Sequence, residues 1–500
     1  MKRRITLPGV LMALLVPGFA FADDRTSISY YKDIRPIFQQ HCNGCHQPAK
    51  PQGGVVMTSH AELFKSGERG KPSIVAGKPS ESYLVEQIQV GPNGKAEMPR
   101  NRDPLTANQI KLITDWIAQG AKDDTPASAG DVVVDADHPP VYSAPPVITS
   151  LAFSPDGQTL AVTGYHEVLL YDTATYKLRS RLIGISERVQ SLAFSPDGKR
   201  LAAVGGAPGR FGEVQIWNPV TGKLMISVPI TYDTLYGVSW SPDGTSVAFG
   251  CADNTVRAID ATSGKQTLQM GTHSDWVLGT VYSQDGLHLA SVSRDMSMKL
   301  TEVATQRFID NVTSITPGAL KGGLMAVDRR PVVAKPIRVF GLETGITAPK
   351  RLQKVPADTP GAKPNLYDEL LAAGSDGRPR LYKMHREVKR EIGDDANKLK
   401  EYEPMPGRIS AVAFNPDGSR FVAVSSLDGK GEVRVYETES GAKVVCEKVT
   451  GPAYTAAWHP SGKLIASAGF DGVVWLHDPT TGKLIDRFVA LPQPGSATNR

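Results

Sequence analysis

The sequence predicts a multidomain chain in which a small all-α domain is followed by an all-β propeller. Its 500 residues exceed the size of one ordinary domain. Helical segments surround a Cys-x-x-Cys-His motif near the N-terminus, whereas an aromatic residue followed by a tight turn recurs through residues 147–490. An Ala-, Asp- and Pro-rich stretch separates the two patterns and is typical of a linker. We expect a helical domain at 23–124, a linker at 125–146, a propeller at 147–490 and a tail at 491–500.

Residues 1–22 have the pattern of a cleaved signal peptide. Basic residues at positions 2–4 precede an apolar run from Ile5 to Phe19, and small residues follow at Ala20 and Ala22. A transmembrane anchor is the alternative, but the run is short and two prolines interrupt it. We expect an exported protein, periplasmic or otherwise outside the cytoplasm, with no transmembrane segment after signal cleavage.

The charge balance gives no support to a nucleic-acid partner. The chain has 56 Lys and Arg against 51 Asp and Glu, a formal net charge of +5, and losing the three basic residues of the signal peptide leaves 5 − 3 = +2. A protein that binds nucleic acid through bulk charge carries a larger excess, gathered in a basic patch or stripe. We therefore expect no nucleic acid among the partners.

Three helices are predicted in residues 23–124. The first spans Tyr30–Gln40 and ends just before Cys42, and a short second one begins at Ser80. The third begins at Thr106, which forms a capping box with Gln109. Its apolar stripe consists of Ile110, Ile113, Trp116 and Ile117. A stripe at this spacing predicts packing against another helix, and we expect the partner to be the first one.

The motif Cys42-Asn43-Gly44-Cys45-His46 follows the first helix. Two thiols separated by two residues can each form a thioether with one vinyl group of a haem, and the next imidazole can bind the iron from one side. A zinc site is the alternative, but zinc needs four ligands, and the other cysteines, Cys251 and Cys446, lie far away in the sequence. The motif predicts one covalent haem c, with His46 as an axial iron ligand.

The ligand on the other side of the iron decides the function, because an open position favours oxygen or peroxide chemistry and a filled one favours electron transfer. Met98 is the best candidate, since Pro99 fixes the backbone of its loop. Met57 and His60 are the alternatives, and Met98 could also be a core residue. His41 directly precedes the motif and could not easily reach the opposite face.

These segments resemble the planctomycete-type cytochrome c domain over about a hundred residues. The resemblance rests on the following stretches: Tyr31-Lys32-Asp33-Ile34-Arg35-Pro36-Ile37-Phe38 before the motif, Met98-Pro99, and Leu105-Thr106 through Trp116-Ile117 to Gly120-Ala121. It implies His46 and Met98 as axial ligands. Arg100 stands where the family usually has a second proline, a difference that does not touch the ligands.

The second part of the chain repeats an aromatic residue followed by a turn. The anchors are Phe153, Phe194, Trp240, Tyr282, Phe414 and Trp458, which lie 41, 46, 42, 132 and 44 residues apart. Most are followed by Ser-Pro-Asp-Gly or a close variant, in which Pro presets the turn and Gly closes it. The third strands are expected at 168–172, 214–217, 256–260, 433–436 and 473–478.

The period is that of propeller blades, and the units resemble WD repeats. The Trp-Asp dipeptide itself is altered to Tyr171-Asp172, Trp217-Asn218 and Ile259-Asp260. The 132-residue interval could hold three units, which would give eight blades, but it contains only one first-strand candidate, Gly323–Val327. We expect residues 331–364 to be an insertion and 369–374 with 380–384 to complete that blade. Seven blades are favoured, and eight stay open.

Polar residues of the repeats have structural explanations. Asp residues recur in the turn before the third strand, where we expect them to bind backbone amides: Asp253, Asp295, Asp376, Asp428 and Asp471. His273, Ser293 and Asp295 could form a nucleophile site, but a structural hydrogen-bond network is the favoured interpretation. Cys251 is expected in an inner strand and Cys446 in an outer one, both as buried, unpaired thiols.

The favoured hypothesis is an exported monohaem cytochrome c whose haem passes electrons to a redox partner protein. The propeller would serve as the docking surface for that protein or a further one. Two alternatives stay open. One is a dehydrogenase whose propeller binds a substrate or quinone cofactor through charged ligands in the central channel. The other is a haem sensor or peroxidase in which Met98 is displaced. A redox carrier is favoured over a self-contained enzyme.

Overall fold

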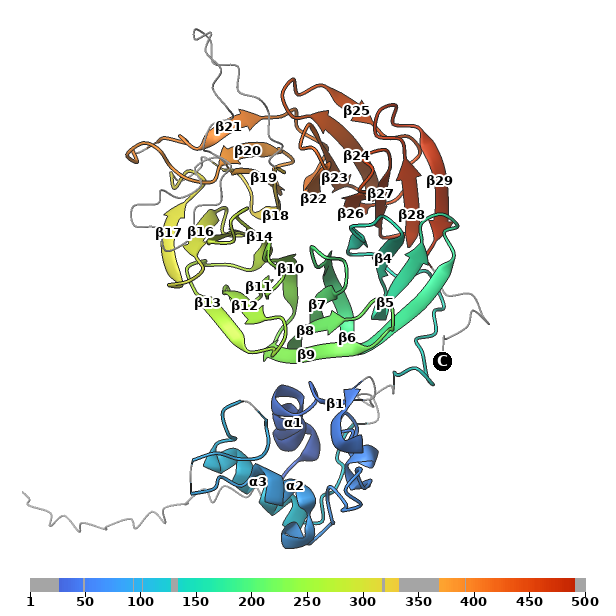
Figure 1. Cartoon of the computed structure of the whole chain (residues 1–500), viewed down its shortest axis with the longest axis vertical. Coiled ribbons are helices and arrows are strands. Elements are labelled where there is room, and N and C mark those ends of the chain that lie inside the picture. Colours follow the sequence, from blue (N-terminus) through green and yellow to red (C-terminus); the bar gives the residue numbers. More distant parts are fainter. Residues whose placement is uncertain are drawn as a thin grey trace, which may run out of the picture.

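The computed structural model describes residues 27–47, 50–92, 94–100, 102–126, 134–316, 320–331, 368–391 and 393–490. The predicted signal peptide, nearly all of the predicted insertion and the tail lie outside these residues. The described chain forms a small helical part and a ring of antiparallel sheets around a central opening (Figure 1). None of the described helices is both long and apolar enough to pass through a membrane.

The helical part is held together by aromatic packing between its first and last helices. The first predicted helix begins as a π-helical turn, η1 (Tyr30–Ile34), capped by Ser29, and continues as α1 (Arg35–His41). The Trp116 ring lies 5.4 Å from the Tyr30 ring and 6.3 Å from the Phe38 ring. The predicted packing of the third helix on the first is therefore confirmed.

The remaining elements of this part are short. They are β1 (His46–Gln47), β2 (Lys50–Pro51), η2 (Gln52–Gly54), η3 (His60–Phe64), η4 (Pro79–Glu81), α2 (Tyr83–Ile88) and α3 (Ala107–Ala118). The capping box of Thr106 and Gln109 is present at the start of α3. Leu84 and Ile88 of α2 are both buried, as their shared helical face predicts.

The second part contains one seven-stranded sheet and five four-stranded sheets. The seven strands are β3 (Leu151–Phe153), β4 (Thr159–Thr163), β5 (Tyr165–Asp172), β6 (Leu178–Phe194), β7 (Leu201–Ala207), β8 (Phe211–Trp217) and β9 (Leu224–Thr231). The first half of β6 pairs with β5 and its second half with β7. β6 thus joins two four-stranded units, β3–β6 and β6–β9, which we call the first and second blades.

The other sheets each take four consecutive strands. They are β10 (Leu235–Trp240), β11 (Ser246–Cys251), β12 (Val256–Asp260) and β13 (Gln266–Met270); β14 (Val277–Tyr282), β15 (His288–Ser293), β16 (Met298–Glu302) and β17 (Arg307–Asn311); β18 (Leu324–Arg329), β19 (Glu369–Gly374), β20 (Arg380–Lys383) and β21 (Lys398–Glu401); β22 (Arg408–Phe414), β23 (Arg420–Leu427), β24 (Lys430–Glu437) and β25 (Lys443–Val445); β26 (Ala453–Trp458), β27 (Ile465–Gly469), β28 (Val473–His477) and β29 (Leu484–Val489). β18 pairs with β19, so residues 324–329 and 369–374 belong to one sheet, as predicted.

The recurring turns explain the sequence repeat. In the first turn the Ser154 hydroxyl donates to Asp156 (2.5 Å), and the same Asp oxygen accepts the Gln158 amide (3.0 Å). Gly157 closes the turn with φ 74°, a conformation that disfavours side chains with a Cβ. Equivalent Ser to Asp bonds at residues 195, 241 and 283 are each 2.6 Å long. Local hydrogen bonding of this kind therefore fixes the first hairpin of these units.

The ring is closed by contacts between the first and last sheets. The Ile148 amide donates to the Gly469 carbonyl (2.9 Å), and the Leu151 amide donates to the Thr455 hydroxyl (3.1 Å). Leu151 also shares a buried apolar cluster with Val474. Because these residues all lie within 147–490, the ring needs no strand from the helical part.

We predict that residues 147–490, expressed alone, fold into a β-rich unit that contains no haem. Each sheet packs on its neighbours, and the closing contacts are internal to this segment. Circular dichroism should show a β spectrum with a cooperative thermal transition. A helical or unfolded spectrum would contradict the prediction.

Candidate functional site

The Cys-x-x-Cys-His motif forms a tight turn at the end of α1. The Cys42 amide donates to the Phe38 carbonyl (2.8 Å), which extends the helix by one bond. The amides of Cys45 and His46 both donate to the Cys42 carbonyl, at 3.0 and 3.1 Å. This turn brings both thiols and the imidazole to the same pocket.

Met98 lies in the same pocket, although it is 52 residues away from His46 in the sequence. Its loop is attached to the end of α2, because the Met98 amide donates to the Gln87 carbonyl (2.9 Å). Apolar side chains complete the walls, among them Leu84, Ile88 and Leu105. The structure thus brings together all four residues that the sequence singled out, in apolar surroundings.

His46 has the environment of a metal ligand. Its Nδ1 lies 3.3 Å from the Val55 carbonyl, which favours the tautomer with a proton on Nδ1 and leaves Nε2 free to bind a metal. Burial lowers the pKa of His46, and hydrogen bonds to Val55 and Gln52 oppose this effect only in part. The neutral imidazole, which is the ligand form, is therefore favoured.

The donor set fits a haem c better than zinc. A thioether and an imidazole in one apolar pocket are the axial pair of many cytochromes c, and the two thiols stand at the spacing of vinyl attachment. Zinc would need further thiolate, imidazole or carboxylate ligands. The described residues contain no cluster of three or more His, Cys, Asp or Glu that could hold a metal ion.

The alternatives to Met98 differ in position. His60 is not among the pocket residues: its Nε2 lies 2.8 Å from the Ala121 carbonyl, and its ring packs 4.9 Å from the Tyr30 ring. Met57 does line the pocket, and its amide donates to the carbonyl of His46 (2.8 Å). Met57 therefore stays an alternative to Met98, whereas the structure places His60 elsewhere.

His273, Asp295 and Ser293 belong to a buried hydrogen-bond network, as predicted, and Ser291 is a further member that contacts the His273 ring. Its Nδ1 lies 2.9 Å from Asp295 and its Nε2 lies 2.8 Å from the hydroxyl of Ser291. Ser293 takes part through the backbone of Asp295: its hydroxyl accepts the Asp295 amide (3.1 Å) and donates to the Asp275 carbonyl (2.9 Å). Ser291 and Ser293 share a strand face, and sequence spacing alone could not separate them. The His273 and Asp295 side chains are 0% and 6% exposed, so a substrate has no access.

Four of the five predicted turn aspartates bind backbone amides. Asp253, Asp295, Asp376 and Asp471 each accept the amide two residues ahead, at 3.0 to 3.1 Å. Asp428 differs: it adopts a left-handed backbone (φ 49°) in the two-residue hairpin turn between β23 and β24. Cys251 and Cys446 are buried and form no disulfide, as expected, although Cys446 lies one residue beyond β25.

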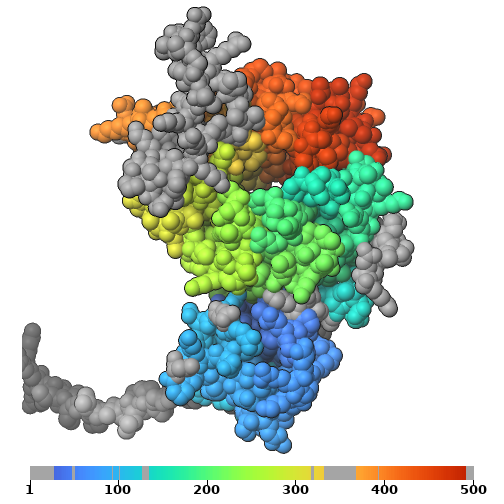
Figure 2. All heavy atoms as spheres, viewed as in Figure 1, coloured from blue at the N-terminus to red at the C-terminus, as the bar shows by residue number. Residues whose placement is uncertain are grey.

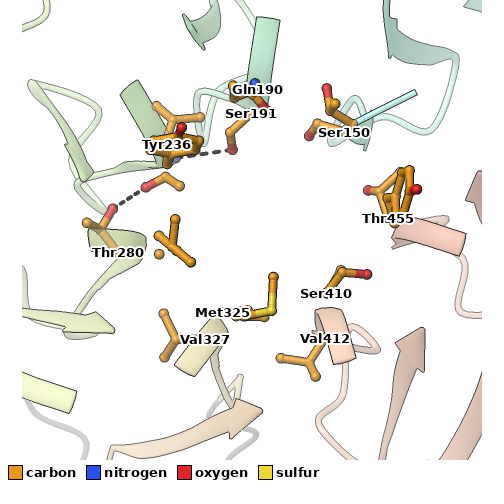
Figure 3. A pocket seen from close by; sticks show the side chains of 18 residues that line it. Ser150, Gln190, Ser191, Tyr236, Thr280, Met325, Val327, Ser410, Val412 and Thr455 are labelled. Carbon is orange, nitrogen blue, oxygen red and sulfur yellow. Dashed lines mark hydrogen bonds between the residues drawn. The ribbon is translucent and has the colours of Figure 1, made fainter. Parts of the chain in front are cut away.

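The ring encloses a central cavity of roughly 380 Å³. Figure 3 shows hydroxyl and apolar side chains from different blades pointing into it, among them Ser191, Thr280, Ser410 and Met325. None of the residues that line this cavity in the described chain is charged. The charged ligands that the dehydrogenase alternative needs are therefore not found there.

Comparison with known proteins agrees with this division of the chain. Residues 42–101 match the family described as planctomycete cytochrome C, and residues 139–172, 228–260 and 264–301 match the WD domain, G-beta repeat. Residues 380–483 match the family described as eukaryotic translation initiation factor eIF2A. The sequence thus joins a cytochrome c domain to WD repeats.

Curated relatives are distant. The serine-threonine kinase receptor-associated protein of Gallus gallus is 20% identical over 255 residues, 50% of this chain and 68% of that protein. The protein of the same name from Bos taurus is 21% identical over 253 residues, with the same shares of the two chains. The WD repeat and SOCS box-containing protein 1 of Danio rerio is 28% identical over 94 residues, 18% of this chain and 22% of that protein.

We predict that Cys42→Ala or Cys45→Ala weakens haem attachment and that the double variant abolishes covalent attachment, because each thiol would form one thioether. Haem that stays with the chain after denaturing electrophoresis measures the effect. Cys251→Ala is the matched control, since this thiol is buried in β11 and does not line the pocket of the motif, and it should retain the haem. Covalent haem in the double variant would contradict the assignment.

We predict that Asp295→Ala lowers the free energy of unfolding by about 1–3 kcal/mol at neutral pH, because it leaves buried donors without a partner. Burial alone would raise the pKa of Asp295, but bonds from His273 and Ser297 outweigh it and hold the pKa below its ordinary value. The ionised form thus stabilises the fold above the ordinary pKa of about 4, and this contribution is lost as the pH falls further.

The measurement is chemical unfolding as a function of pH. The difference in the free energy of unfolding between the wild type and Asp295→Ala should become smaller below about pH 4. Asp253→Ala, which removes a more exposed turn aspartate, should cost less. A difference in unfolding free energy that grows as the pH falls would contradict the stabilising role of the ionised Asp295 carboxylate.

Proposed function

We propose that the protein is an exported monohaem c-type cytochrome that transfers electrons through a haem ligated by His46 and Met98. The observation that supports this most directly is the convergence of Cys42, Cys45, His46 and Met98 on one apolar pocket. The signal-like residues 1–22 support a periplasmic or otherwise exported location. Export fits haem c, whose covalent attachment takes place outside the cytoplasm.

When bound, a haem c supplies reversible one-electron oxidation and reduction of its iron. Cys42 and Cys45 would fix the group covalently, and His46 and Met98 would fill both axial positions, which leaves no site for oxygen or peroxide. The Met98 thioether favours ferrous iron and raises the reduction potential. The apolar side chains of Leu84, Ile88 and Leu105 would reduce contact between the group and water, which would limit solvation of the ferric charge.

We infer that the ring is a seven-bladed propeller that serves as a docking scaffold for the redox partner or a further protein. Five four-stranded sheets and the two blades that share β6 account for seven. The uncharged central cavity supports a scaffold over a dehydrogenase. The name of the receptor-associated relatives describes association with another protein, which is consistent with a docking role here.

We predict that Met98→Ala opens the sixth iron position. The ferric protein should change from low-spin to high-spin or water-ligated, and its potential should fall because the ligand that favours ferrous iron is gone. Cyanide binding should become at least about tenfold faster, since each 1.36 kcal/mol removed from the barrier gives a factor of ten. Absorption spectra, redox titration and stopped-flow mixing measure these three changes.

Met57→Ala is the matched comparison, because Met57 lines the same pocket. If Met57 held the iron, Met98→Ala would leave spectrum and potential nearly unchanged, and Met57→Ala would alter both. A high-spin wild-type spectrum with rapid peroxide turnover would instead favour the sensor or peroxidase alternative over electron transfer.

A further inference from the structure

A glutamate occupies the same position in the third strand of three blades. The aligned stretches are Glu167-Val168-Leu169-Leu170-Tyr171-Asp172 in β5, Glu213-Val214-Gln215-Ile216-Trp217-Asn218 in β8 and Glu432-Val433-Arg434-Val435-Tyr436-Glu437 in β24. In two of them the carboxylate has an arginine partner: Arg181 lies 2.6 Å from Glu167, and Arg434 pairs with Glu432. In these two blades the glutamate is thus in an ion pair, although Arg181 lies on the adjacent outer strand and Arg434 on the same strand as its partner.

The second blade has neither arginine, since Ser227 stands in the place of Arg181 and Gln215 in the place of Arg434. Arg181 pairs with Leu169 across the first blade, and Ser227 pairs with the equivalent Gln215 across the second, so Ser227 stands where Arg181 stands. Glu213 is fully buried and accepts from the hydroxyls of Ser186 (2.5 Å) and Ser227 and from the Gln215 side-chain amide (2.8 Å). It forms no ion pair with any residue of the described chain, and the space of the missing arginine is left to another group.

That group comes from the haem domain. Gln47 follows His46 directly and is fully buried. Its side-chain amide donates to the Ser227 hydroxyl (2.9 Å) and to the carbonyl of Asn43 inside the motif (3.1 Å). Because the Ser227 hydroxyl gives its own hydrogen to Glu213, it accepts from Gln47, so the Gln47 amide group bridges the Asn43 carbonyl of the motif and the hydroxyl that binds the buried carboxylate.

Two further contacts place the motif against the outer strand of the second blade. A Cβ added to Gly44 would lie 2.5 Å from the Ser227 carbonyl oxygen and 2.9 Å from Pro229 Cδ, so the backbones meet too closely for a side chain. The Tyr232 hydroxyl donates to the Gln40 side chain of α1 (2.5 Å). Figure 2 shows the helical part lying against this side of the ring.

We propose that Gln47, Ser227 and Glu213 form a positioning relay through which the second blade holds the haem motif, so that the propeller sets the orientation of His46 and the haem potential. The relay rests on the proposed function for its redox effect, but its docking role does not. The contact also excludes water from the motif. Loss of the contact would expose the site to water, which solvates the more highly charged ferric state and lowers the potential.

The sharpest test is Ser227→Arg in the full chain. It recreates the ion pair of the first blade beside Glu213, so the propeller should stay folded, while the longer side chain takes the place of Gln47. Ser180→Arg is the matched control, because it adds the same charge to the outer strand of the first blade. Gly44→Ala breaks the contact from the other side and leaves both cysteines and His46 in place.

We expect Ser227→Arg and Gly44→Ala each to increase the radius of gyration in small-angle X-ray scattering, lower the midpoint potential and shift the ferric electron paramagnetic resonance signal. Ser180→Arg should match the wild type in all three. The double variant should change no more than either single one, because both substitutions remove one interaction.

Two results would overturn the proposal. In one, Ser227→Arg releases the haem domain but leaves the midpoint potential and the resonance signal unchanged. The contact would then dock the two parts without any effect on the haem. In the other, both single variants scatter like the wild type, which would remove the docking role. A wild type purified without haem would instead refute the proposed function, and the scattering comparison would still decide docking. If Ser227→Arg fails to fold, Gly44→Ala makes the same comparison.

Discussion

One tight turn at the end of α1 has to satisfy two surfaces at once. Its inner side presents Cys42, Cys45 and His46 to the pocket, and its outer side touches the second blade at Gly44. A turn of five residues has no slack between these sides, because the Cys42 carbonyl already accepts two amides within it. The same short turn therefore lies against the pocket and against the second blade.

Features that depend on short stretches of chain could be predicted from the sequence. The capping box of α3 and the Ser-Pro-Asp-Gly turns are fixed by bonds between residues at most five apart, so their residue types appear together in the sequence. Pairing of β18 with β19 is long-range, yet it was predictable because the repeat period left one strand unpartnered. In each case a periodic or local sequence pattern was enough to predict the structural feature.

Features that depend on which of two similar side chains contacts a given partner could not be predicted. Ser291 and Ser293 lie two residues apart on one strand, so both face the same side, and only the position of the His273 ring selects Ser291. Met57 and Met98 present the same problem in the pocket, because both thioethers reach it from different loops. His60 is different, since packing against Tyr30 turns it away. Tertiary packing decides which side chain makes each of these contacts, and the spacing of residues in the sequence does not show it.

The contact between the two parts was recorded in the sequence, but as a departure from a pattern. Functional residues are hard to recognise in repeats, because residues that recur in every blade are explained by their structural role. Ser227 stands where the first blade has Arg181, so Glu213 is held by neutral donors of its own blade, and the Ser227 hydroxyl can accept a hydrogen bond from outside the blade. The cytochrome c domain reaches this position through Gln47, whose side-chain amide donates to the Ser227 hydroxyl. In a repeat protein, a blade that departs from the repeat pattern can thus indicate where another part of the chain binds, and here that part is the cytochrome c domain.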